Sequence, residues 1–163
     1  MNSGPFAGFW QYTLTVTWDT GSMYALSHLT FDLDLDDCPC VCEDDFWRFD
    51  NPAGESDGED QNGDPCTVHW VGEFVCDGDP TTPQDGPAIK WDPIENGCEP
   101  GTTGSGTFVL YSPHAPEPGD PRELWIKFDG LDCQGLVTGD LPGCNGCPTS
   151  VEPSTWGQIK NTF

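Results

Sequence analysis

Nine cysteines in a chain of 163 residues constrain its fold more than any other feature. Three of them, Cys38, Cys40 and Cys42, occupy alternate positions inside the acidic stretch DDCPCVCEDD. In an extended strand these three side chains share one face and lie too far apart to bridge comfortably to one another. We therefore expect each of them to pair with a separate partner. The remaining six cysteines are Cys66, Cys76, Cys98, Cys133, Cys144 and Cys147.

Zinc binding and redox chemistry are the alternatives to a disulfide framework. Only Cys144 and Cys147 have the two-residue gap of a zinc knuckle, and the sequence holds no second such pair. A thioredoxin-like CxxC would sit in a βαβ pattern, and the sequence shows none. The spread of the cysteines favours structural disulfides and therefore an oxidising, extracellular compartment. Because nine is odd, one thiol is expected to be free or paired with another chain.

The charge balance limits the partners. Five Lys and Arg against 28 Asp and Glu give a formal net charge of −23. Phosphates and anionic lipid surfaces would be repelled, so we expect no nucleic-acid partner and no binding to an anionic membrane surface. No apolar run is long enough for a membrane span. Cations are natural partners, whereas the simplest reading of the charge is solubility.

Period-two alternation predicts an all-β fold. Aromatic and aliphatic residues alternate with Gln and Thr from Trp10 to Trp18, and similar patterns cover 29–35 and 66–76. Weaker strands are expected at 88–91, 106–111, 123–128 and 134–138. Clusters of Gly, Pro and Asp predict long loops at 51–65, 78–87, 96–105, 112–121 and 139–148. About seven short strands with such loops indicate an antiparallel β-sandwich stapled by disulfides.

Both ends of this acidic chain carry apolar residues. We expect a β-sandwich domain over 10–148, preceded by an apolar extension (1–9) and followed by a C-terminal tail (149–163). Ser154 is a suitable N-cap for a short helical turn, which is too short to be stable unless it docks on something. The predicted assembly contacts are Phe6, Phe9 and Trp10 at one end and Trp156, Ile159 and Phe163 at the other.

Three segments carry a resemblance to known proteins. SVEPSTWGQIKNTF, GEFVCDGDP and CEPGTTGSGTFVLYS resemble a group of uncharacterised secreted, cysteine-rich bacterial proteins that end in a Ser/Thr-Trp-Gly-x-Ile-Lys segment. The resemblance extends from about Leu26 onwards and departs at Phe163, where one more basic residue is expected. It implies export and a cysteine-rich β domain, and it implies no activity.

Calcium is the one cofactor that the sequence suggests. Carboxylates recur on the outer face of a predicted strand and again in the predicted loop over 50–64. Ca²⁺ takes six to eight oxygen ligands, so either group could hold it. The loop does not match the EF-hand pattern, and the alternative is a solvated acidic surface. The candidate ligands are Asp32, Asp34, Asp36, Asp57, Glu59, Asp60 and Asp64.

Catalytic motifs are absent from the sequence. It contains no G-x-S-x-G, HExxH or glycine-rich phosphate loop, and the histidines His28, His69 and His114 are isolated from one another. We therefore expect no enzymatic activity. Trp47, Trp91 and Trp125 are candidates for a sugar-binding platform, although core packing explains most tryptophans in a small core.

These patterns together predict a secreted structural protein at the cell surface, the self-assembling subunit of an extracellular filament or surface layer. In such an assembly an apolar terminal segment of one copy adds to the sheet or groove of the next. The alternative is a monomeric cell-surface module that binds Ca²⁺ or carbohydrate. A secreted hydrolase ranks third.

Overall fold

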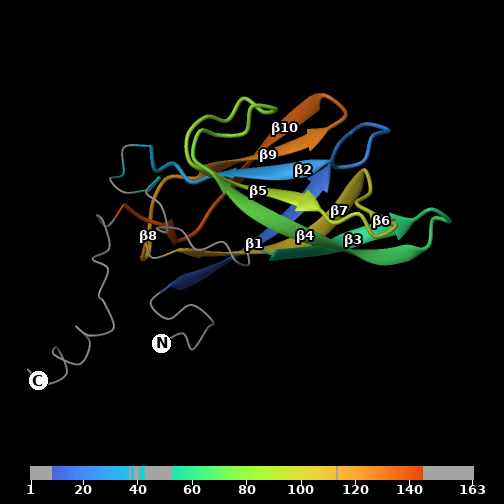
Figure 1. The fold of residues 1–163 in the computed structure, drawn as a ribbon, viewed down its shortest axis with the longest axis horizontal. Helices are drawn as coiled ribbons and strands as arrows, with labels where there is room; N and C mark the ends of the chain where they lie inside the picture. The colour runs from blue at the N-terminus through green and yellow to red at the C-terminus, as the bar shows by residue number, and fades with distance from the viewer. Residues whose placement is uncertain (1–8, 37, 39–40, 43–52, 113, 145–163) are drawn as a thin grey trace, which may run out of the picture.

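The fold is all-β in the part of the chain that the structure describes. A computed structural model (Figure 1) describes residues 9–36, 38, 41–42, 53–112 and 114–144. No helix occurs in these ranges, and hence none long and apolar enough to cross a membrane. The strands are β1 (Trp10–Asp19), β2 (His28–Asp32), β3 (Ala53–Asp60), β4 (Pro65–Val75), β5 (Ala88–Pro93), β6 (Cys98–Glu99), β7 (Thr103–Ser112), β8 (Pro116–Glu117), β9 (Arg122–Phe128), β10 (Leu131–Val137) and β11 (Leu141–Pro142).

One curled antiparallel sheet forms the body of the molecule. Its strand order is β1-β7-β3-β4-β5-β2-β9-β10, with β6 paired to β3, while β8 and β11 form a separate two-stranded sheet. The curl places β9, β2 and β5 across from β1 and β7 (Figure 1), and the residues between them form one hydrophobic cluster. The predicted antiparallel sandwich with disulfides is therefore confirmed.

Alternation along β1 explains how it contributes to this core. Tyr12, Leu14, Val16 and Trp18 are buried, while the polar residues between them are exposed. The strand pairs with β7 in continuous register from Trp10↔Ser112 to Asp19↔Thr103. The period-two pattern read from the sequence is thus the burial pattern of the strand.

Strand β3 corrects the prediction of a loop over 51–65. It pairs with β4 on one side and with β7 on the other. Its inward positions carry small residues because large neighbours already fill the space: a Cβ at Gly54 would collide with the Phe108 ring, and Ser56 accepts a hydrogen bond from Trp70 Nε1 at 2.9 Å. The candidate ligands Asp57 and Glu59 therefore lie on a strand and not in a loop.

Strand β2 is shorter than predicted, and its outer face is covered. It ends at Asp32, and Asp34 has a φ of 47°, which ends the extended backbone. Thr30 alternates with the inward-facing Leu29 and Phe31, yet it is fully buried, and its hydroxyl donates to Asp79 Oδ2 at 2.8 Å. The short strands β6, β8 and β11 also lie in segments predicted as loops.

Three disulfides hold the described part together. They join Cys38 to Cys144, Cys42 to Cys76 and Cys66 to Cys98. Cys38 and Cys42 do not lie in a strand, so the predicted extended C-x-C-x-C face is wrong, but each of the two has a separate, distant partner as expected. The bridges are compatible with an extracellular protein.

Candidate functional site: an open seam between β1 and β10

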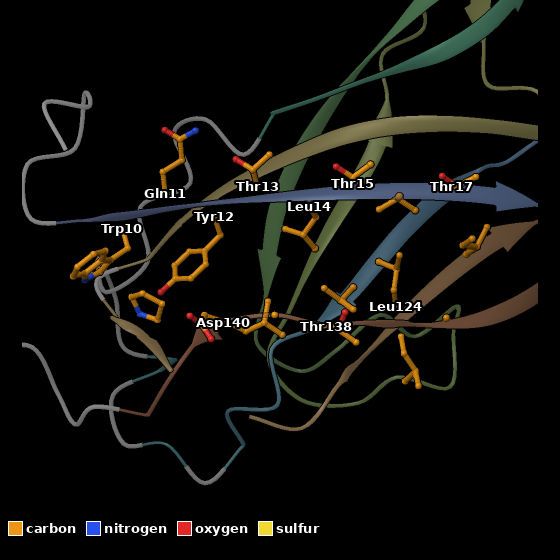
Figure 2. A pocket seen from close by; sticks show the side chains of 18 residues that line it. Trp10, Gln11, Tyr12, Thr13, Leu14, Thr15, Thr17, Leu124, Thr138 and Asp140 are labelled. Carbon is orange, nitrogen blue, oxygen red and sulfur yellow. The ribbon is translucent and has the colours of Figure 1, made fainter. Parts of the chain in front are cut away.

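The curled sheet leaves a groove where its first and last strands face each other. Strand β1 pairs only with β7 and β10 only with β9, so no strand of the described part joins them. The groove between them, which we call the seam, has a volume of about 680 Å³. Figure 2 shows Tyr12 and Leu14 of β1 pointing into it, while Gln11 and Thr13 point away. Leu124 and Ile126 of β9 also line it, together with the end of β10 and the segment that follows.

The lining of the seam is almost free of charge. Among the described residues, Asp140 is its one charged residue, in a protein with a net charge of −23. Two large apolar side chains in the seam remain open to solvent, with Trp10 46% and Leu136 64% exposed. Long edge strands are usually protected by charges or prolines, and residues 10–18 of β1 have neither. Such an edge is suited to receive a further chain segment.

Polar contacts hold the Trp10 end of the seam in place. The Tyr12 hydroxyl donates to the His114 carbonyl at 2.6 Å, and burial raises the pKa of Tyr12. Arg122 Nη2 donates to the Pro142 carbonyl at 2.6 Å. Burial likewise lowers the pKa of His114, which favours its neutral form. These contacts connect β1 to the segment before β8, and β9 to β11.

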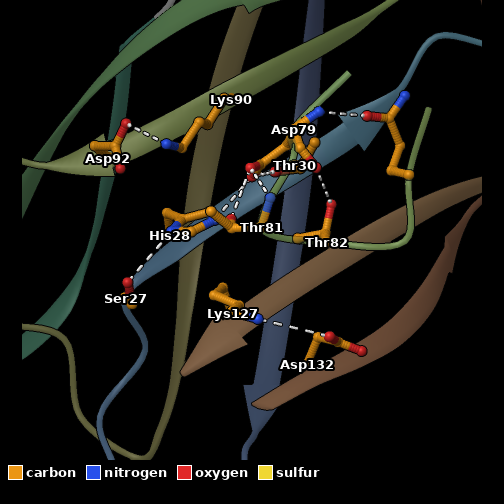
Figure 3. Close-up of polar contacts among 11 residues, drawn as sticks. Ser27, His28, Thr30, Asp79, Thr81, Thr82, Lys90, Asp92, Lys127 and Asp132 are labelled. Carbon is orange, nitrogen blue, oxygen red and sulfur yellow. Dashed lines mark hydrogen bonds and ion pairs between the residues drawn. The ribbon is translucent and has the colours of Figure 1, made fainter. Parts of the chain in front are cut away.

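A second group of functional residue types surrounds Asp79 (Figure 3). This carboxylate is 1% exposed and accepts hydrogen bonds from the Thr30 hydroxyl and from the hydroxyl and amide of Thr81. His28 Nε2 lies 2.8 Å from Asp79 Oδ2, and His28 Nδ1 lies 3.2 Å from the Ser27 hydroxyl. The Asp79 amide donates to Gln84 Oε1 at 3.1 Å.

The protonation of this cluster follows from burial and hydrogen bonding. Burial raises the pKa of Asp79, but the hydrogen bonds from Thr81 and Thr30 outweigh it and bring the pKa to about 2. Burial lowers the pKa of His28 more than the charge of Asp79 raises it. The cluster is therefore a charged carboxylate beside a neutral imidazole near pH 7.

Ser27, His28 and Asp79 are the residue types of a hydrolytic triad, but their arrangement favours a structural role. None of the three lines the seam. The hydrogen bonds that Asp79 accepts come from β2 and from Thr81 in its own segment, which tie the segment after β4 to β2. A sequence search could not pair Thr30 with Asp79, because they are 49 residues apart.

The predicted calcium ligands are not brought together. Asp57 and Glu59 lie on β3, whereas Asp60 closes the β3–β4 hairpin by accepting hydrogen bonds from the amides of Asn62 and Asp64. These hydrogen bonds lower the pKa of Asp60. The row of Asp32, Asp34 and Asp36 is broken by the end of β2. Among the described residues, no three His, Cys, Asp or Glu are grouped as a metal site. Calcium binding stays a prediction.

The remaining candidates take separate positions. His69 lies on the surface, 3.3 Å from Glu55, on the face opposite the core as expected. Trp91 is fully buried against Phe108, so it is not part of a sugar platform; Trp125 donates to Glu123, and Trp47 lies outside the described residues.

Only some of the predicted cysteine and assembly residues lie in the part of the chain that the structure describes. Cys133 on β10 is a free, exposed thiol, as expected for one of nine, while Cys40 and Cys147 lie outside the described residues. Among the predicted assembly contacts, Trp10 lines the seam and Phe9 precedes it. Phe6, Trp156, Ile159 and Phe163 lie outside the described residues. Comparison with known proteins found no matching family model, curated protein or solved structure.

The sequence predicted strand β1, but it gave no role to the residues of β10 that line the other side of the seam. Leu136 and Val137 were assigned to a weak strand with no functional role. The available signal was that β1 carries no charge over its whole apolar stretch, which is unusual in so acidic a chain.

Proposed function

We propose that this protein is the self-assembling subunit of an extracellular filament or surface layer, and that copies associate through the seam. The observation that carries the proposal is that, in the described part of the chain, the sheet ends on two edge strands facing a groove with one charged residue in its lining. Backbone groups at such edges give affinity to an added segment, while side-chain pockets give specificity. Export to an oxidising compartment is part of the proposal, supported by the disulfides.

Electrostatics sets a condition on this assembly. At −23 per copy, subunits repel one another, and the repulsion is screened over a Debye length of about 8 Å at physiological salt. An uncharged contact surface avoids adding to this repulsion. Assembly is therefore expected to strengthen as salt is added, because apolar burial is retained while repulsion is screened.

Two substitutions on β10 form a matched test. Leu136 is 64% exposed and lines the seam, whereas Leu131 is 54% exposed on the same strand and does not. Leu136→Asp should leave the protein monomeric by light scattering under conditions in which the wild type and Leu131→Asp assemble. Electron microscopy of the wild type should show ordered filaments or layers. A wild type that stays monomeric at all protein, salt and calcium concentrations would refute the proposal, as would normal assembly of Leu136→Asp.

A further inference from the structure

One end of the seam lies near the point where the described part of the chain ends, at Cys144. Asp140 lies at the Trp10 end of the seam (Figure 2), and Leu141, the next residue, also lines it. The chain then continues through β11, whose Leu141 pairs with Glu117, to Cys144, which is bonded to Cys38. The residues after Cys144 therefore start from a fixed position at this end of the groove.

The tail that follows has the composition that the seam requires. In 149–163 the charged side chains are Glu152 and Lys160, so the tail is neutral in a chain that is otherwise strongly acidic. Its large apolar residues are Trp156, Ile159 and Phe163. Their spacing of three and four residues places them on one side of a short helical turn, which gains stability only by docking.

The seam and the tail are complementary in charge and in apolar surface. The exposed apolar groups of the seam are Trp10 and Leu136, and its single charge is that of Asp140, opposite in sign to Lys160. Building on the proposed function, we infer that the seam of one copy binds the C-terminal tail (149–163) of a neighbouring copy through Trp156, Ile159 and Phe163.

Two properties of the tail favour a neighbouring copy over its own groove. Pro148 and Pro153 favour extended backbone at the residues before them, and extended backbone gives the segment a longer reach. The eleven residues between Cys144 and Trp156 can also span up to roughly 40 Å when extended. Such a tether lets two bodies of charge −23 stay up to about five Debye lengths apart while remaining joined, whereas direct pairing of two β1 edges brings them into contact.

A mixing experiment with full-length chains tests the inference. The tail variant Trp156→Ser/Ile159→Ser retains a seam but has no apolar tail, and the seam variant Leu136→Asp retains the tail. Each alone should be monomeric. An equimolar mixture should form a species of twice the monomer mass and nothing larger, because each pair uses the one working seam and the one working tail. Gln158→Ser/Asn161→Ser, which alters only polar tail residues, should assemble like the wild type.

The outcomes separate this inference from the proposed function. If Leu136→Asp is monomeric but the tail variant assembles normally, the seam mediates assembly and the tail does not, and loss of assembly in Phe6→Ser/Phe9→Ser would identify the N-terminal extension as the occupant. If both variants are monomeric and their mixture is too, the tail does not act between copies and the inference is wrong. If the wild type itself never assembles, the proposed function fails first.

Discussion

Asp79 provides a direct test of how the segment after β4 is held on the sheet. The pKa of this carboxyl is lowered from 3.8 to about 2. One pKa unit corresponds to about 1.4 kcal/mol, so folding favours the charged form by about 2–3 kcal/mol. Asp79→Asn mimics a permanently neutral acid of the same shape. We expect it to lower the free energy of unfolding by about 2–3 kcal/mol at pH 7.

The pH dependence of this loss is the sharper part of the prediction. Because the folded pKa is lowered, the stabilisation is present above the ordinary value of 3.8 and is lost as the pH falls towards about 2. The difference between wild type and variant should therefore shrink to under about 1 kcal/mol near pH 2. Subtracting the two curves at each pH largely cancels the contribution of His114, whose lowered pKa also makes acid destabilising. The contribution of His28 does not cancel, because Asp79 raises the pKa that burial lowers, so the variant loses further stability where His28 becomes protonated and the decrease is read between pH 3.8 and about 2.

The assay is urea unfolding of both proteins from pH 7 to pH 2 with the disulfides intact. Asp85→Asn is the matched control, because Asp85 is exposed in the same segment, and a surface change of this kind should alter stability by less than about 0.5 kcal/mol. If the difference in free energy of unfolding between the wild type and Asp79→Asn stays constant across this pH range, the charge of the Asp79 carboxylate is not the source of the stabilisation.

Three further predictions concern the sheet, the bridges and the acidic hairpin β3–β4. Gly54→Val should destabilise the fold by about 1–3 kcal/mol in urea unfolding, because its side chain would displace Phe108; unchanged stability would mean that β3 is not packed there. Cys66→Ser/Cys98→Ser should cost about 2–4 kcal/mol, whereas Cys133→Ser should not alter the melting temperature, and Cys133 should react with a thiol reagent in the native protein. Calcium titrated into the protein should release or absorb heat and raise the melting temperature, and EDTA should reverse this rise. If neither effect is seen, the hairpin is a solvated acidic surface.

The sequence predicts strands well where apolar residues fill the inward positions. Strand β1 is such a case, because Tyr12, Leu14 and Val16 are both apolar and buried. Strand β3 is the opposite case: Gly54, Ser56 and Gly58 face inward, so the space they leave is filled by neighbours such as Val68 and Phe108. The large apolar side chains then lie on the neighbouring strands, and the sequence of β3 by itself resembles an acidic loop.

The functional candidates depend on topology, which local patterns do not contain. Whether a strand lies at an edge is decided by the sheet order, and β1 and β10 become the two edges only because β7 and β9 are their single partners. The burial of Asp79 is equally non-local, since Thr30 lies on a strand 49 residues away. The absence of charge over residues 10–18 of β1, in a chain with a net charge of −23, is a local signal that the sequence does contain.

The Cys38–Cys144 bridge has a mechanical consequence for the proposed assembly. Tension on a docked tail enters the body at Cys144 and crosses to Cys38 through a covalent bond that spans 106 residues of sequence. The backbone of the strands from β3 to β11 lies inside this closed loop, so tension that passes from Cys144 to β1 crosses to Cys38 and follows the chain through β2 without extending that backbone. Reduction would open the loop and release an extensible chain of roughly 350 Å per subunit. An oxidised fibre should thus be stiff, and a reduced one should lengthen under the same force.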